Sequence, residues 1–195
     1  MIVVELAIII YSVILHEIAH GWVADRLGDP TARLYKRLTL NPIPHIDPLY
    51  TILLPLILII TGAGIIFGAA KPVPIDPYNF RDKKKDTALV ALAGPVTNIL
   101  IACLFALLFR ISPNDIFLSA MALNIGLAVF NLIPIPPLDG FKILAGVLSD
   151  DIANMMYKLE NYGLTVVFML LFFFPQVISA FTRPISQFLF KLLLP

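Results

Sequence analysis

The chain has 195 residues, of which 59% are hydrophobic, and its mean hydropathy is +0.90. Soluble domains usually contain about 45–50% apolar residues, so this composition excludes an ordinary soluble protein and indicates an integral membrane protein. The formal net charge of +1 gives no sign of the basic surface that binds nucleic acid. The single cysteine, Cys103, excludes an intramolecular disulfide.

Apolar stretches recur along the chain and predict membrane helices. They cover residues 2–24, 49–67, 87–109, 116–133 and 162–174, with a shorter sixth at 177–194. The first four are long enough, or nearly so, to cross about 30 Å of hydrocarbon at about 1.5 Å per residue. No polar stretch is long enough for a separate soluble domain. We therefore expect a single integral-membrane domain, residues 1–195, of all-α class with about five to six transmembrane helices.

The first apolar stretch contains His16-Glu17-Ile18-Ala19-His20, an H-E-x-x-H motif. No Lys or Arg precedes this stretch, so we expect a retained transmembrane helix and not a cleaved signal peptide. On a helix, positions i and i+4 share a face, so both imidazoles can reach one Zn²⁺ while Glu17 acts as general base on the attacking water. The competing interpretation is a pair of partly buried histidines beside an incidental Glu. Such groups would be costly to leave unpaired in hydrocarbon, which favours a metal.

The second apolar stretch, residues 49–67, lies between two basic loops. If it crossed the membrane, the two loops would face opposite sides, against the positive-inside rule. We therefore expect a re-entrant segment broken by Pro55, Gly62 and Gly64; an ordinary transmembrane helix beside one loop that violates the rule is the simpler alternative. With a re-entrant segment, eleven of the fourteen Lys and Arg residues are cytoplasmic, all except Arg110, Arg183 and Lys191. The metal-binding motif then lies near the cytoplasmic face.

A catalytic zinc site needs a third protein ligand and an open position for water. The metzincin pattern would require histidine where the chain has Arg26, and the only downstream Glu, Glu160, lies in a polar loop. Asp139 follows the fourth apolar stretch, after three prolines between residues 134 and 137 that prevent the helix from continuing. By itself Leu-Asp-Gly is a turn signal. Beside a membrane H-E-x-x-H motif, Asp139 becomes the strongest candidate for the third ligand.

Three motifs together resemble the site-2 protease family of intramembrane zinc metalloproteases. They are His16-Glu17-x-x-His20, Ala93-Gly94-Pro95-Val96-Thr97-Asn98, and Asn131-x-x-Pro134 followed by Leu138-Asp139-Gly140. The segments Asn41-Pro-Ile-Pro-His45-Ile-Asp47-Pro48 and Ala70-Lys71-Pro72-Val73-Pro74 further resemble the short prokaryotic branch, which implies a prokaryotic cell membrane. Phe141 follows Gly140 where many relatives have a second glycine, and the PDZ or CBS modules of many relatives are absent from these 195 residues.

The resemblance implies one Zn²⁺ held by His16, His20 and Asp139, with Glu17 as the base and Asn131 as a hydrogen-bond donor in the active site. The Asn131 amide could donate to the oxyanion that forms at a scissile carbonyl, or it could bond to a carbonyl freed by the broken helix.

Other polar residues have simpler interpretations. Asn98 is expected to tie helices together or to satisfy backbone groups freed near Pro95. His45, among prolines, could be a ligand, a proton shuttle or a substrate contact, but we expect it to satisfy backbone groups of an ordered loop. Glu5 precedes His16 by about 16 Å of helix and is expected to be interfacial.

Two segments between the first helix and the Gly-Pro-x-x-Asn helix have strand-like character. Residues 33–40 have rough β character, and residues 71–75 are extended by their prolines. They predict a short β-like element that could line the entrance to the site and present a strand edge to an unwound substrate. A basic loop resting on anionic head groups explains residues 33–40 nearly as well.

The predicted function is an intramembrane zinc endopeptidase that cleaves membrane-spanning or membrane-associated polypeptides near the cytoplasmic face. Its expected partners are such a substrate and the lipid bilayer, with no nucleic acid, and a homo-oligomer is compatible with the sequence. The alternative is a non-proteolytic zinc-binding scaffold or a metal transporter. Transporters usually distribute polar ligands along a path through the bilayer, whereas these ligands cluster at one depth. Glu17 would also be superfluous to transport, so hydrolysis is favoured.

Overall fold

The computed structural model describes residues 2–62 and 68–194. Within these residues the chain is helical, and no segment of them forms a strand. In chain order the elements are α1 (Ile2–Leu27), α2 (Thr31–Leu34), η1 (Ile43–His45), η2 (Pro48–Leu53), α3 (Leu54–Ile60), η3 (Pro77–Asn79), α4 (Lys83–Ile111), α5 (Asp115–Asn131), α6 (Asp139–Val147), α7 (Asp150–Leu159), η4 (Glu160–Tyr162), α8 (Gly163–Phe173) and α9 (Pro175–Leu193). The all-α class is therefore confirmed.

The predicted β-like element is wrong for the described residues. Arg33 and Leu34 belong to the short helix α2, and residues 71–76 are irregular. Residues 72 and 74 are both prolines, which keep the chain extended but remove two of the N–H groups that a ladder would need. The segment is extended for the predicted reason, yet the described residues provide it with no partner strand.

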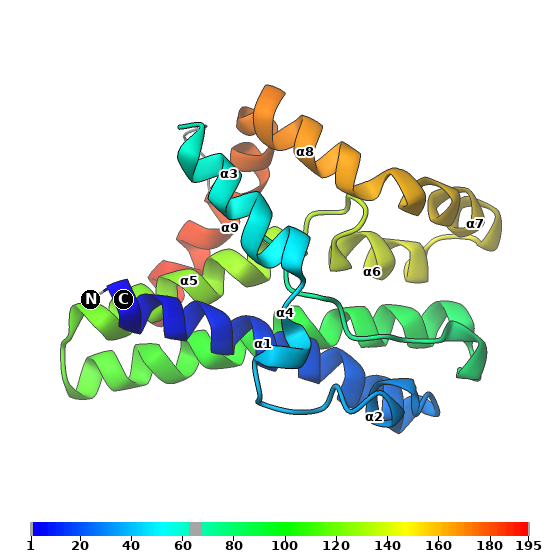
Figure 1. The fold of residues 1–195 in the computed structure, drawn as a ribbon, viewed down its shortest axis with the longest axis horizontal. Helices are drawn as coiled ribbons and strands as arrows, with labels where there is room; N and C mark the ends of the chain where they lie inside the picture. Colours follow the sequence, from blue (N-terminus) through cyan, green and yellow to red (C-terminus); the bar gives the residue numbers. More distant parts are fainter. Residues whose placement is uncertain (1, 63–67, 195) are drawn as a thin grey trace.

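Three helices form the body of the molecule (Figure 1). α1 and α4 run side by side in opposite directions, and α5 returns along α4 in the direction of α1. α4 is central, because it packs against α1, α5 and α6. Its buried positions include Ala91, Gly94, Ala102 and Ala106, and such small residues let helix backbones approach closely in a membrane.

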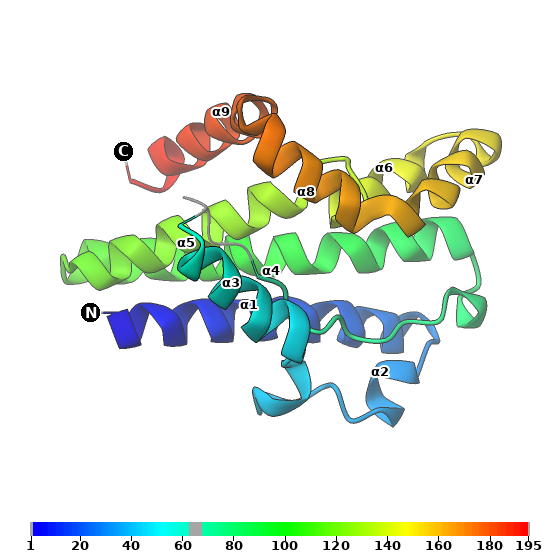
Figure 2. The ribbon, with the colours of Figure 1, turned by 45° about the horizontal axis from the view of Figure 1, so that its top comes forward.

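Among the described residues, two helices, α1 and α4, are long and apolar enough to cross a membrane. α7 to α9 would make a third crossing only if the helices on the two sides of a 90° bend count as one broken span, and α5 is a shorter apolar helix. Length and composition thus account for two or three spans of the predicted five to six. The sequence did not predict α6 and α7, which lie together at the end of the molecule away from the chain termini (Figure 2).

The segment between the two basic loops returns to where it started. The Ala69 N–H donates to the Tyr50 carbonyl at 3.1 Å, and the Lys71 N–H donates to the His45 carbonyl at 2.9 Å. Between these points lie η2 and α3, an apolar helical stretch of residues 48–60. Pro55 lies in the first turn of α3, and Gly62 follows with φ +64°; the predicted break at Gly64 lies outside the described residues.

Candidate metal centre

α1 supplies two histidines that face the same point. His16 and His20 are one helical turn apart, are 6% and 7% exposed, and place their Nε2 atoms 3.0 Å from each other. Ser12 is one further turn back on the same face and is also buried. The i, i+4 spacing therefore brings both imidazoles together, as the motif predicts.

Asp139 completes a three-residue cluster from a distant part of the chain. It is the first residue of α6, and its Oδ2 lies 3.1 Å from His16 Nε2 and 3.3 Å from His20 Nε2. Gly140 permits this placement, because a Cβ there would overlap the carbonyls of Leu132 and Ile133 at the end of α5. The proline-containing turn before α6 thus packs directly onto α5 and points the carboxylate at the histidines.

α4 holds the far side of both imidazole rings. His20 Nδ1 lies 2.7 Å from the Val90 carbonyl and His16 Nδ1 lies 2.6 Å from Asn98 Oδ1. Between them Gly94 leaves room for the rings: a Cβ there would stand 2.5 Å from His16 Nε2 and in contact with His20 Nε2. Val90, Gly94 and Asn98 are four residues apart, so one ridge of α4 matches the histidine face of α1.

The donor set fits a zinc ion. A carbonyl only accepts, so Nδ1 of His20 carries the proton and its Nε2 presents a lone pair to the cluster. Asp139 Oδ2 is buried without a hydrogen-bond donor, although two imidazole nitrogens lie beside it. Ligand atoms of the three residues all lie within 4.8 Å of one another. Two imidazoles and one carboxylate, with room for a fourth ligand, are the set that a catalytic zinc takes.

Glu17 lies beside the cluster on the wall of a cavity of about 800 Å³. Its Oε2 accepts a hydrogen bond from the Val73 N–H at 2.8 Å. Pro72 and Pro74 have no N–H, so Val73 is the only residue of this short run that can make such a bond. The extended segment 71–75 therefore runs past the cluster and holds one oxygen of the Glu17 carboxylate.

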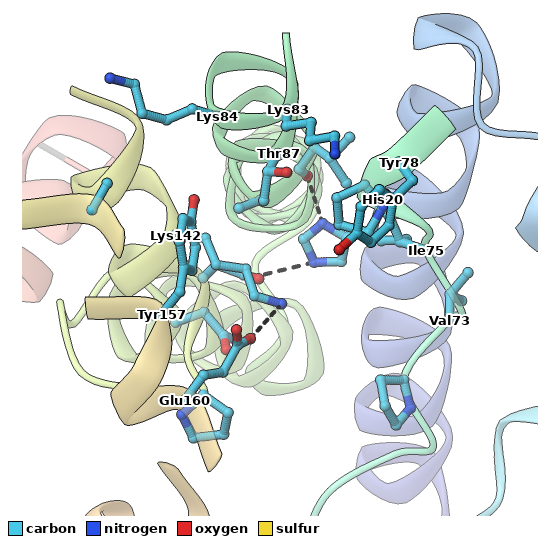
Figure 3. A pocket seen from close by; sticks show the side chains of 18 of the residues that line it. His20, Val73, Ile75, Tyr78, Lys83, Lys84, Thr87, Lys142, Tyr157 and Glu160 are labelled. Atoms are coloured by element: carbon cyan, nitrogen blue, oxygen red, sulfur yellow. Dashed lines mark hydrogen bonds and ion pairs between the residues drawn. The ribbon is translucent and has the colours of Figure 1, made fainter. Parts of the chain in front are cut away.

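The cavity reaches from the histidines to α6, α7 and η4. Figure 3 shows His20 on one side of it and Lys142, Tyr157 and Glu160 on the other. Lys142 Nζ pairs with Glu160 Oε1 at 3.3 Å, and Lys84 Nζ pairs with Asp150 Oδ1 at 2.5 Å. Basic and acidic side chains of the lining therefore pair with one another, and the cavity carries no strong excess of either charge.

The remaining predicted residues lie outside the three-residue cluster. Asn131 lines the cavity, but its Nδ2 donates to the Leu127 carbonyl at 3.0 Å, one turn back on α5. His45 places Nε2 2.9 Å from the Thr39 carbonyl and accepts from Lys71 N–H through its own carbonyl, so it holds the loop together. Glu5 lines a separate hollow between α1 and α5.

One polar contact to the cluster was not predicted, that between Asn98 Oδ1 and a ring nitrogen of His16. Asn98 does tie helices together as expected, because it bonds to His16 on α1 and to Asn124 on α5. Asn124 on α5 was not considered at all, although it is fully buried and bonds to Asn98. A lone amide inside the apolar stretch 116–133 was the available signal, because an unpaired amide is costly in hydrocarbon.

Comparisons with known proteins find relatives among zinc metalloproteases. Residues 108–174 match the family model described as peptidase family M50. The candidate zinc metalloprotease YwhC of Bacillus subtilis is 38% identical over 181 residues, which cover 86% of this chain and 78% of YwhC. The candidate zinc metalloproteases called Rip2 are 33% identical over 82% of this chain and 63% of the protein in Mycolicibacterium smegmatis, and 29% identical over 93% and 70% in Mycobacterium tuberculosis. No solved structure matches the chain. The chain therefore belongs to peptidase family M50, the site-2 protease family of zinc metalloproteases.

Proposed function

We propose that this protein is an intramembrane zinc endopeptidase that hydrolyses peptide bonds of membrane-spanning or membrane-associated substrates near the cytoplasmic face. The observation that carries the proposal is the convergence of His16, His20 and Asp139 on one point, with Glu17 on the next position of the same helix. In this proposal the three residues hold one Zn²⁺, and Glu17 and Asn131 act on the substrate.

Each residue of the site has its own role in the proposed hydrolysis. A bound zinc ion supplies a Lewis acid that polarises the scissile carbonyl and makes water acidic. Glu17 takes the proton from the attacking water and passes it to the leaving amine, while the Val73 N–H keeps its carboxylate in place. Asn131 has a second amide N–H beyond the one given to Leu127, and this donor serves the developing oxyanion from the cavity wall.

The fold supports an intramembrane setting for this chemistry. The histidines lie within α1, one of the two helices that are long and apolar enough to cross a membrane. A peptide bond inside a helix is shielded by its own hydrogen bonds, so a helical substrate has to unwind before it is cut. The cavity of about 800 Å³ beside the cluster has room for such an extended segment.

A re-entrant segment between the two basic loops gives the topology that we propose. The bonds from Ala69 to Tyr50 and from Lys71 to His45 close its two ends on each other. The helical stretch between them, residues 48–60, spans about 20 Å, which is short of a bilayer core of about 30 Å. Asn79 Nδ2 also donates to Asp29 at 2.7 Å, so the loops before and after the segment meet at one end of α1 and α4.

Glu17→Gln tests the hydrolytic function. The variant should retain about one zinc per chain and lose turnover by about 10²–10⁴-fold, because an amide cannot accept the proton. Proteomics of membrane fractions should reveal a fragment that wild type produces and Glu17→Gln does not. Glu5→Gln is the matched control: it is a Glu on the same helix, about 18 Å away along the axis, and should behave as wild type.

Two outcomes would contradict the proposal. Peptidase activity that persists in zinc-replete Glu17→Gln would remove Glu17 from the mechanism. Zinc flux across proteoliposomes, with no Glu17-dependent cleavage of any membrane peptide, would favour a transporter. Among the described residues, His16, His20 and Asp139 are the only group of three such ligands, and a path across the bilayer would need more.

Single cysteines test the topology in a Cys103→Ser background. Tyr35 and Arg81 are exposed and lie in the loops before and after the re-entrant segment, and Ser112 is exposed between α4 and α5. An impermeant thiol reagent should label Tyr35→Cys and Arg81→Cys from the cytoplasmic side and Ser112→Cys from the opposite side. Labelling of the first two positions from opposite sides would establish a full crossing of the segment.

A further inference from the structure

A chain of buried polar side chains leads away from the metal centre across three helices. Asn98 Oδ1 on α4 lies 2.6 Å from His16 Nδ1, and Asn98 Nδ2 donates to Asn124 Oδ1 on α5 at 3.0 Å. Asn124 Nδ2 in turn donates to Ser12 Oγ on α1 at 3.0 Å and to the Ala120 carbonyl at 2.9 Å. Asn98 and Asn124 have no exposed surface, and Ser12 is 3% exposed.

The Ala120 carbonyl fixes which group donates and which accepts in the hydrogen bonds between Asn124, Asn98 and His16. The Ala120 carbonyl can only accept, so the NH₂ group of Asn124 has to point toward it. The oxygen of Asn124 therefore faces Asn98 and accepts from the Asn98 NH₂ group. The oxygen of Asn98 is then the atom that faces His16. The proton of the His16 ring consequently lies on Nδ1, and the lone pair on Nε2 faces Asp139 and His20.

His20 needs no such chain, because its Nδ1 meets a backbone carbonyl, that of Val90, which cannot rotate. His16 meets a side-chain amide, which could present either oxygen or nitrogen if nothing held it. We infer that Asn98 and Asn124 are positioning residues: together they fix the ring orientation and tautomer of His16 so that Nε2 is available to zinc. The inference rests on the proposed role of His16 as a ligand.

The alternative is that the three polar residues only join α1, α4 and α5, as polar side chains do in membranes. The two roles differ in what a substitution changes. A purely structural contact affects the stability of the metal-free protein and leaves the zinc affinity of the folded protein unchanged. A positioning contact weakens zinc binding itself, typically by about 10–100-fold when the partner of a ligating histidine is removed.

The test measures the zinc dissociation constant by chelator competition, and the thermal stability without metal, on the full chain in detergent. Asn98→Leu should weaken zinc binding by about 10–100-fold. Asn124→Leu should weaken it less, because Asn98 stays but is free to rotate, and Ser12→Ala should be close to wild type because Ala120 still orients Asn124. Asn98→Asp keeps an acceptor for His16 and should bind zinc more tightly than Asn98→Leu.

Met121→Ala is the matched control. Met121 is fully buried on α5, within one turn of Asn124, and packs in an apolar cluster with Ala102 and Ile125. This variant should lower thermal stability without changing the zinc dissociation constant. If Asn98→Leu does not fold, the zinc dissociation constants of Asn124→Leu and Asn98→Asp still distinguish a positioning role from a structural one.

The result that overturns the inference is distinct from failure of the metal site. If His16→Ala loses zinc while Asn98→Leu and Asn124→Leu keep the wild-type dissociation constant, the positioning role is wrong and the ligand assignment stands. If His16→Ala binds zinc as tightly as wild type, the proposed ligand set itself is wrong.

Discussion

Two carboxylates with buried oxygens, those of Asp29 and Asp139, have opposite surroundings. Asp29, just after α1, has no exposed surface and receives hydrogen bonds from neutral donors only: Thr31 N–H and Oγ1–H, Asn79 Nδ2 and Asp76 N–H. Asp139 directs its buried Oδ2 at two imidazole nitrogens and receives no hydrogen bond on that oxygen. The first carboxylate is satisfied by neutral donors of the protein, and the second faces two imidazole nitrogens with which it can share a cation.

The difference separates a structural carboxylate from a ligand. Burial alone would raise the pKa of the Asp29 carboxyl, but its hydrogen bonds from Thr31, Asp76 and Asn79 outweigh burial and hold the pKa below its ordinary value. Asp29 therefore stays ionised while it clamps the loop before α4 to the end of α1. At Asp139 the facing atoms are themselves lone-pair donors, which bind a cation and not each other.

The largest expected effect is on zinc. Asp139→Ala should reduce the zinc content from about one per chain to near zero, because two imidazoles alone leave the site without its third ligand. Asp29→Asn and His45→Ala should keep their zinc, since neither residue belongs to the cluster. Metal analysis of the purified variants decides the matter. Full zinc in Asp139→Ala together with loss in Asp29→Asn would reverse the roles assigned to the two carboxylates.

A pair of glycine substitutions sharpens the comparison. Gly94→Ala puts a methyl group against both imidazoles and should cost about 1–3 kcal/mol and lower zinc affinity. Gly28→Ala, beside Asp29, strains a backbone with φ +111° at a similar cost of about 1–3 kcal/mol, but should leave zinc affinity unchanged.

Gly126→Ala is the control for both glycine variants, because the added methyl group on α5 meets no described atom within 4 Å beyond its own helix backbone and chain neighbours. Its stability should change by less than about 1 kcal/mol. Thermal unfolding and chelator competition measure both quantities. Equal zinc affinities in Gly94→Ala and Gly28→Ala would show that α4 does not confine the histidines.

The smallest expected effect is the acid dependence of the Asp29 clamp. At neutral pH, Asp29→Asn should destabilise the protein by about 1–3 kcal/mol, since an NH₂ group replaces an acceptor opposite buried donors. A carboxyl whose pKa is lower in the folded state contributes its full stability above its ordinary pKa of 3.8 and loses it as pH falls through the folded value. The stability difference between wild type and Asp29→Asn should therefore shrink below about pH 4. A difference that grows on acidification would contradict the clamp.

Local patterns were enough for the parts of the site that lie on one helix. The H-E-x-x-H spacing places His16 and His20 together because a helix repeats every 3.6 residues, whatever surrounds it. Apolar runs predicted α1, α4 and α5 with ends that differ by a few residues. The sequence did not predict α6 and α7, because they are short and follow a turn rich in proline, where there is no long apolar run.

Contacts between distant residues were not accessible in the same way. Asp139 was a candidate from its place after a broken helix, and the resemblance to a family named it as a ligand, but its approach to His16 depends on α6 packing against α4 and on Gly140 meeting the end of α5. The bond from Val73 to Glu17 joins residues 56 positions apart. Neither the sequence around Glu17 nor that around Val73 predicts this hydrogen bond.

By itself the sequence determined a membrane protein of helices, a pair of histidines on one face and a nearby base, because composition and helical period act over a few residues. Tertiary structure alone decided that Asp29 is held by neutral donors, and it brought Asp139, already a candidate from the sequence, to the two imidazoles. It also decided that two asparagines from different helices meet behind His16. An unpaired polar group is costly when it is buried, so it needs a hydrogen-bond partner. That partner comes from a helix packed against it and not from a neighbour in sequence.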